Sequence, residues 1–198
     1  ISFSWEEVRS HYAAFESDVK GGASEVYLHE MPGGQFTNLK EQARALGLES
    51  RWHEVARAYH DVNMMFGDII KVTPSSKVVG DMALMMVSQN LSVEEVQDPR
   101  KEIAFPESVV SMLRGDLGQP PGGWPEALQK KVLKGEEPIT VRPGSLLPPM
   151  DLEASRKELE EKLGRAVNDF EFASWLMYPK GFTEFAAAQE TYGPVSTL

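Results

Sequence analysis

The feature that most constrains the fold is a stripe of apolar side chains recurring every three or four residues between positions 52 and 66. This spacing places them on one face of an α-helix, with Glu54 and Arg57 on the opposite face. Asn63 falls on the apolar face and needs a hydrogen-bond partner there if it is buried. The stripe consists of Trp52, Val55, Ala56, Tyr59, Val62, Asn63 and Phe66. It predicts a helix that is buried along one side.

Similar patterns along the rest of the chain predict eight or nine helices, and no segment of any length alternates like an amphipathic strand. The segments expected to be helical are 4–19, 36–46, 52–66, 74–90, 106–113, 127–133, 152–163, 170–177 and 182–189. Caps are expected at Ser4, at Asp151, and at Asn168 with Glu171 as a capping box. Segment 25–31 is expected to be short and partly extended, Pro32–Gln35 a tight turn, and 91–106, 115–125 and 136–150 irregular. The predicted fold class is mainly α, an irregular multi-helix domain.

Composition excludes several classes of protein. The 198 residues carry a net charge of −10, which argues against a surface for nucleic acid or anionic membrane. No apolar run approaches the roughly 20 residues needed to span a bilayer. Cysteine is absent, so disulfides and thiolate chemistry are excluded, and a cytoplasmic or organelle-matrix setting fits. The length predicts one domain. The sequence starts without methionine, so we expect a piece of a longer protein.

Residues 71–81 hold the strongest candidate site. Thr73 precedes a proline and is therefore expected outside the helix, as its N-cap, with Pro74, Ser75 and Ser76 opening the helix. Hydroxyl groups and Lys77 would then lie beside free backbone N–H groups, a place that attracts carboxylates and other anions. The simpler interpretation is a capped, buried helix without a ligand.

Two other patterns indicate structure rather than chemistry. His53 and His60 are seven residues apart, whereas zinc-binding pairs on a helix usually sit four apart. The Pro32–Gln35 turn lacks the motifs of phosphate-binding loops. We therefore predict no metal site in this chain.

Three long blocks resemble the pyruvate carboxylase family, and the resemblance covers essentially the whole chain. The blocks are Glu25–Leu39, Phe66–Asp81 and Phe170–Lys180. Gly181 departs from the family pattern, which tends to have an apolar side chain there. Oxaloacetate decarboxylase and transcarboxylase subunits resemble the first block more loosely.

The resemblance implies that residues 1–198 form the helical region after a TIM-barrel carboxyltransferase, packed at the mouth of the barrel. The full enzyme would move a carboxyl group from carboxybiotin to pyruvate, giving oxaloacetate. It would use biotin, a divalent metal (Zn or Mn) and, at a separate domain, ATP. Its partners would be pyruvate, the biotin carrier domain and the barrel, within a homotetramer of the bacterial cytoplasm or the mitochondrial matrix. The barrel, which holds the metal ligands, is outside this chain, so the isolated chain is expected to be inactive.

The resemblance also implies roles for individual residues. Thr73 would relay a proton between the pyruvate methyl group and biotin, and Ser76 would contact biotin. Lys77 is included in the predicted substrate and biotin pocket. Whether the Thr73 side chain caps its own helix or is free to relay is left open by the sequence. Two alternatives stand beside this interpretation: a decarboxylase or transcarboxylase subunit, and a docking scaffold without chemistry of its own.

Overall fold

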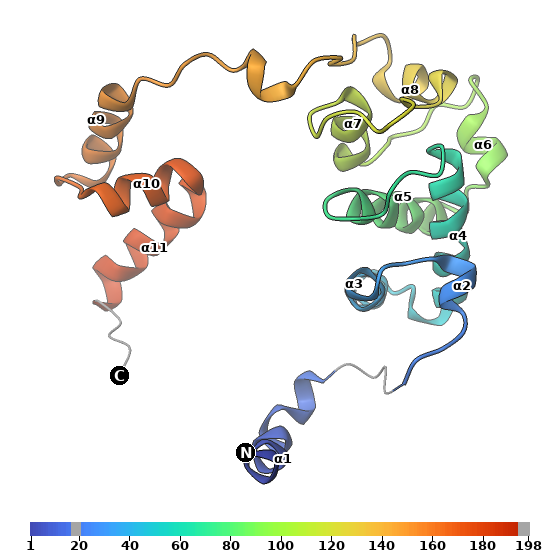
Figure 1. Cartoon of the computed structure of the whole chain (residues 1–198), viewed down its shortest axis with the longest axis horizontal. Helices are drawn as coiled ribbons and strands as arrows, with labels where there is room; N and C mark the ends of the chain where they lie inside the picture. Colours follow the sequence, from blue (N-terminus) through green and yellow to red (C-terminus); the bar gives the residue numbers. More distant parts are fainter. Residues whose placement is uncertain (17–20, 194–198) are drawn as a thin grey trace. The chain divides into compact units, whose positions relative to one another are not determined.

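The computed structural model describes residues 1–16 and 21–193, and every regular element in those ranges is helical (Figure 1). The prediction of a mainly α fold is thus confirmed. The α-helices are α1 (Ser2–Tyr12), α2 (Val26–His29), α3 (Gly33–Ala45), α4 (Trp52–Met65), α5 (Ser75–Gln89), α6 (Val93–Gln97), α7 (Glu107–Arg114), α8 (Glu126–Leu133), α9 (Leu152–Leu163), α10 (Asp169–Met177) and α11 (Pro179–Tyr192). Short 3-10 turns cover Ala13–Phe15, Glu49–Arg51 and Pro143–Leu146.

The chain divides into two compact units, Ile1–Leu146 and Leu147–Leu198. In the first unit α4 and α5 pack on each other, and α2, α3 and α6 to α8 join them. The predicted stripe of α4 is buried, and the Asn63 amide donates to the Asp68 carboxylate at 2.8 Å. Helix α5 is buried nearly all round, as its apolar sequence predicts.

The second unit has its own core, built from α9, α10 and α11 around Leu159, Phe172 and Trp175. The two caps predicted in this unit are confirmed. The Asp151 carboxylate accepts the N–H of Ala154, and Asn168 and Glu171 form a reciprocal capping box on α10. These caps satisfy amide groups that a helix leaves unpaired at its start.

Several local predictions are wrong. Segment 25–31 contains the helix α2, and Gly33 to Gln35 form the first turn of α3 rather than a tight turn. Segment 91–106 contains α6, which begins with a capping box of Ser92 and Glu95. The sequence signal for α6 was present in this Ser-x-x-Glu spacing. The extra helices α2 and α6 bring the described α-helices to eleven instead of eight or nine.

Two predictions at helix starts are also wrong. Ser4 lies inside α1, whose N-cap is Ile1. The spacing of Leu152, Leu159 and Leu163 also predicts that all three face inward, but Leu152 is 56% exposed because it is the first residue of α9. The predicted end of the first helix, at Val19 and Lys20, lies outside the described residues.

None of the helices in the described part of the chain is both long and apolar enough to cross a bilayer.

Candidate functional site

The site predicted from sequence lies on the connection between α4 and α5. Residues 69–72 have no regular structure, and Thr73 and Pro74 form a turn joined by a cis peptide bond. Helix α5 begins only at Ser75, with Pro74 in the N-cap position and no side-chain cap. The prediction that Thr73 caps the helix is therefore wrong. The physical reason is that the Val72 carbonyl already accepts the N–H of Ser76 at 2.9 Å.

The amide hydrogens at the start of α5 are also less free than the sequence suggested. The N–H of Ser76 is bound by Val72, and the N–H of Lys77 donates to the Pro74 carbonyl at 3.1 Å. An anion could not use these two donors without breaking backbone hydrogen bonds. The expected cluster of free N–H groups is thus smaller than predicted, and side chains become more important for binding a ligand here.

The Ser75 hydroxyl binds the backbone that precedes the turn and does not cap α5. Its hydroxyl oxygen accepts the N–H of Val72 at 3.2 Å, and it lies 2.6 Å and 2.7 Å from the carbonyl oxygens of Ile70 and Val72. Hydroxyl groups of serine often fix turns in this way. The effect is that the backbone before Thr73 is tied to the first residue of α5.

The Thr73 side chain is left exposed, and its hydroxyl has no hydrogen-bond partner within the described ranges. A threonine hydroxyl has one donor and two acceptor positions. Here all of them are available to a ligand, on a backbone that neighbouring groups hold in place. The question that the sequence left open has an answer in this structure: the side chain does not cap the helix.

Ser76 follows in the first turn of α5 and is 7% exposed. Its hydroxyl likewise has no partner among the residues the structure covers, and its carbonyl accepts a long hydrogen bond of 3.4 Å from Tyr59. Burial raises the pKa of Tyr59 to about 12, so this phenol stays protonated and can act as the donor.

Lys77 is exposed, and its ammonium group pairs with the Asp81 carboxylate one turn along α5 at 2.7 Å. The Ser108 hydroxyl of α7 binds the same carboxylate oxygen, also at 2.7 Å. Lysine has three N–H donors, so this ion pair orients the ammonium without using up its capacity to bind. Asp81 was not singled out from sequence, although the Lys77–Asp81 spacing of four is a known helix pairing.

On the other side of Thr73, the Lys71 ammonium binds the Glu30 carboxylate at 2.8 Å. Nδ1 of His60 lies 3.7 Å from the same oxygen of Glu30. The hydrogen bond and positive charge of Lys71 hold the pKa of Glu30 below its usual range. Glu30 and Lys71 are 41 residues apart, so no local pattern could have shown this pair.

Gln35 is a further polar group that sequence reasoning missed. It is buried, and its Nε2 has no hydrogen-bond partner among the described residues. The Gln35 Nε2 lies 2.5 Å from the place that a Cβ on Gly80 would occupy. Gly80 follows Ser76 by one turn of α5. A buried amide donor without an acceptor is uncommon in folded proteins. Gly80 and Ser76 are four residues apart and share one face of α5, so the Gln35 amide lies on the same side of α5 as Ser76.

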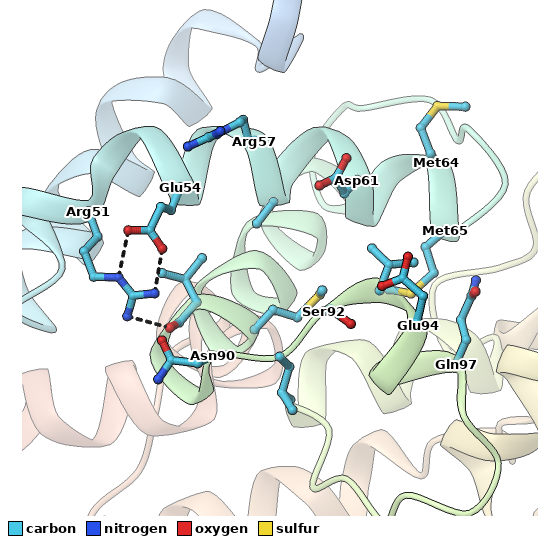
Figure 2. A pocket seen from close by; sticks show the side chains of 15 residues that line it. Arg51, Glu54, Arg57, Asp61, Met64, Met65, Asn90, Ser92, Glu94 and Gln97 are labelled. Carbon is cyan, nitrogen blue, oxygen red and sulfur yellow. Dashed lines mark hydrogen bonds and ion pairs between the residues drawn. The ribbon is translucent and has the colours of Figure 1, made fainter.

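A large pocket of about 870 Å³ lies elsewhere, between α4, the end of α5 and α6. Figure 2 shows its side chains, with Arg51 bridging Glu54 and the Val87 carbonyl at one end and Glu94 and Gln97 at the other. Its lining includes none of Thr73, Ser76 and Lys77. A smaller pocket of about 190 Å³ borders the Thr73 turn through Ile70, Pro74 and Ser75. The Thr73 turn is therefore a better candidate for the functional site than the larger pocket, because the unpartnered hydroxyl groups lie at the turn.

Comparison with known proteins decides the family. Residues 26–198 match the family described as the conserved carboxylase domain. The chain belongs to this family. It is 51% identical to Bacillus subtilis pyruvate carboxylase over all 198 residues and 47% identical to human mitochondrial pyruvate carboxylase over 196. It spans 17% of the length of each of these relatives.

Solved structures of this carboxylase family show the same fold. The chain is 76% identical to the carboxyl transferase domain of Rhizobium etli pyruvate carboxylase, in a structure with pyruvate and biocytin, with a TM-score of 0.93. All of the chain and 33% of that structure are covered. In the complete multifunctional enzyme from the same organism the TM-score is 0.92 and 19% is covered. The family resemblance expected from the sequence is confirmed, and the barrel is not part of this chain.

Proposed function

We propose that residues 1–198 form the post-barrel helical region of a biotin-dependent pyruvate carboxylase, which converts pyruvate to oxaloacetate. The whole protein would also contain a barrel, a biotin carrier domain and an ATP-using domain, and it would act as a homotetramer in the bacterial cytoplasm or the mitochondrial matrix. Support comes from relatives named pyruvate carboxylase and from a structure at 76% identity that contains pyruvate and biocytin.

In this proposal Thr73 is the proton relay. Carboxybiotin, when bound, supplies the carboxyl carbon as CO2. The Thr73 oxygen accepts a proton from the pyruvate methyl group and passes its own hydroxyl proton to the biotin ring nitrogen, so the threonine ends unchanged. The pyruvate carbon then forms the new bond to CO2. The observation that carries the proposal is the exposed, unpartnered Thr73 hydroxyl on a tied backbone.

The polar groups beside Thr73 fit the ring of biotin, which carries one urea oxygen and N–H groups. The Ser76 hydroxyl can donate or accept, and the Lys77 ammonium keeps N–H donors beyond its bond to Asp81. Ser76 and Lys77 would therefore hold biotin. The described residues contain no group of three His, Asp or Glu that could hold a metal ion. A divalent metal, Zn or Mn, is accordingly assigned to the barrel, and the isolated chain is expected to turn over no pyruvate.

The test is Thr73→Ala in the full-length protein, with both half-reactions measured. A positioned proton relay contributes roughly 10²–10⁴-fold, so oxaloacetate formation should fall by about that factor. Bicarbonate-dependent ATP cleavage should persist, because it occurs at another domain. Thr73→Ser keeps the hydroxyl and should lose less. Thr37→Ala is the matched control, since Thr37 is also exposed and its hydroxyl donates to the Gly34 carbonyl.

Oxaloacetate formation within a few-fold of the unmodified protein in Thr73→Ala would refute the relay and favour the docking scaffold. A protein that decarboxylates oxaloacetate without any ATP-dependent step would instead favour the decarboxylase or transcarboxylase subunit.

A further inference from the structure

The segment that carries Thr73 has few restraints of its own. Residues 69–72 lie outside any helix; Ile69 is buried in the core, but the side chains of Ile70 and Val72 are exposed. Segments with little packing and few backbone hydrogen bonds open easily. A proton relay, by contrast, works only when its oxygen is held at a fixed place, since a displacement of about 1 Å can reduce a rate by about 10²-fold. The structure must therefore contain groups that fix this segment.

Ser75 provides one restraint, but only a local one. Its hydroxyl ties Ile70 and Val72 to the start of α5. These bonds fix the shape of the turn. They tie Ile70 and Val72 to α5 and leave the Lys71 side chain, between them, to be held from another part of the chain.

The second restraint comes from a distant part of the chain. Lys71 binds Glu30, which ends α2 in a left-handed conformation with φ of 56° and donates its own N–H to the Val26 carbonyl. Helix α2 in turn contacts α4. The ion pair thus links the backbone two residues before Thr73 to a helix that packs on the core.

The surroundings make this pair different from an ordinary surface ion pair. The Lys71 side chain is only 15% exposed. A shielded ammonium whose partner loses its negative charge is left with an uncompensated charge, and it gains hydration by moving outward. Removing the Glu30 charge should therefore displace Lys71 and the backbone beside it. The nearby His60 ring, at 3.7 Å from the same oxygen, offers the ammonium no acceptor of equal charge.

We propose that Glu30 is a positioning residue that holds the Thr73 hydroxyl in place through Lys71. The proposal rests on the role of Thr73 given above.

The experiment uses four forms of the full-length protein: unmodified, Glu30→Gln, Thr73→Ala and the double variant. We expect Glu30→Gln to lower carboxyl transfer about tenfold and to leave bicarbonate-dependent ATP cleavage unchanged. In the Thr73→Ala background the same substitution should change the residual rate less than about twofold, because residues acting as one unit are not additive. Lys71→Arg keeps the ion pair and should retain most of the rate.

Glu126→Gln is the matched control. It removes the charge from another Glu–Lys pair, with Lys130 at 2.6 Å, whose partners are both largely exposed. It should leave carboxyl transfer unchanged. Melting curves of all variants report any general loss of fold, which would lower both half-reactions together.

Hydrogen exchange separates this proposal from that for Thr73. Glu30→Gln should speed exchange in peptides covering residues 69–76. Unchanged exchange there would overturn the positioning role, whatever the activity of Thr73→Ala. The positioning role would also be overturned if Glu30→Gln lowered carboxyl transfer by the same factor in the unmodified protein and in Thr73→Ala. Full activity of Thr73→Ala would refute the relay itself, and with it any action of Glu30 through that hydroxyl.

Discussion

At the scale of single residues, the buried His29 should make the stability of this protein depend on pH. His29 is 4% exposed, and its Nδ1 accepts the N–H of Met31 at 3.0 Å, so the ring must be neutral. Burial lowers the pKa of His29, although the charge of Glu25 opposes this. As the pH falls through the ordinary histidine range, the unfolded chain takes up a proton that the folded chain resists. The free energy of unfolding is therefore highest above that range and decreases as the pH falls through it.

The prediction is that the melting temperature of the chain falls between pH 7.5 and 5.5, and that His29→Gln makes this slope shallower. His53→Gln is the control, because His53 is exposed on α4. Differential scanning fluorimetry over this pH range would measure it. Identical slopes for His29→Gln and the unmodified chain would contradict the assignment.

At the scale of elements, the close approach of α3 to α5 depends on Gly80. A Cβ at this position would lie 2.5 Å from Nε2 of Gln35 and 2.9 Å from Cδ1 of Leu39. Leu39 is fully buried, so it has little room to move. Gly80→Ala should therefore destabilise the chain by about 1–3 kcal/mol, as overpacking of a core does.

Gly34, in α3, should respond to alanine substitution in the opposite direction. No atom of the residues that the structure describes lies within 4 Å of a Cβ built on Gly34, and alanine in a helix is favoured over glycine by about 0.5–1 kcal/mol. Urea denaturation should show Gly34→Ala as the more stable variant and Gly80→Ala as the less stable one. Equal midpoints would mean that Gln35 and Leu39 shift without cost.

How much the sequence revealed also differs between elements. The long helices α4, α5 and α9 were predictable because their apolar spacing repeats over several turns. The cap of α10 was predictable because Asn168 and Glu171 have the three-residue spacing of a capping box. Helix α2 has four residues, too few for a periodic signal. At the site, the Thr-Pro helix-start pattern singled out Thr73, Ser76 and Lys77, and the family resemblance supplied their roles, which stay predictions. The Lys71–Glu30 pair and the Gln35–Gly80 approach join distant positions, which only the folded chain brings together.

On the scale of the whole molecule, a considerable amount of apolar surface is exposed. In α1 no residue is buried, and Trp5 and Phe15 are exposed, as are Ile70 and Val72 beside Thr73. Exposed apolar surface of this kind marks sites of association. It agrees with the proposal that a barrel covers part of this region in the full-length protein.

We therefore predict that the isolated chain self-associates. Sedimentation velocity at increasing protein concentration should show oligomers, and a hydrophobic dye should bind. Trp5→Lys together with Phe15→Lys should reduce both signals, whereas Lys180→Ala, on exposed surface of α11, should not. A monodisperse monomer without dye binding would contradict the prediction.

The two units have a consequence for how stability is defined. Each unit closes its own apolar cluster, one around α4 and α5 and the other around Leu159, Phe172 and Trp175. Cooperative melting is a property of a single core. A calorimetric trace of this chain should therefore be fitted as two overlapping transitions, with the enthalpy of the larger unit dominating the area. Its stability is therefore described by two free energies of unfolding, one for each unit.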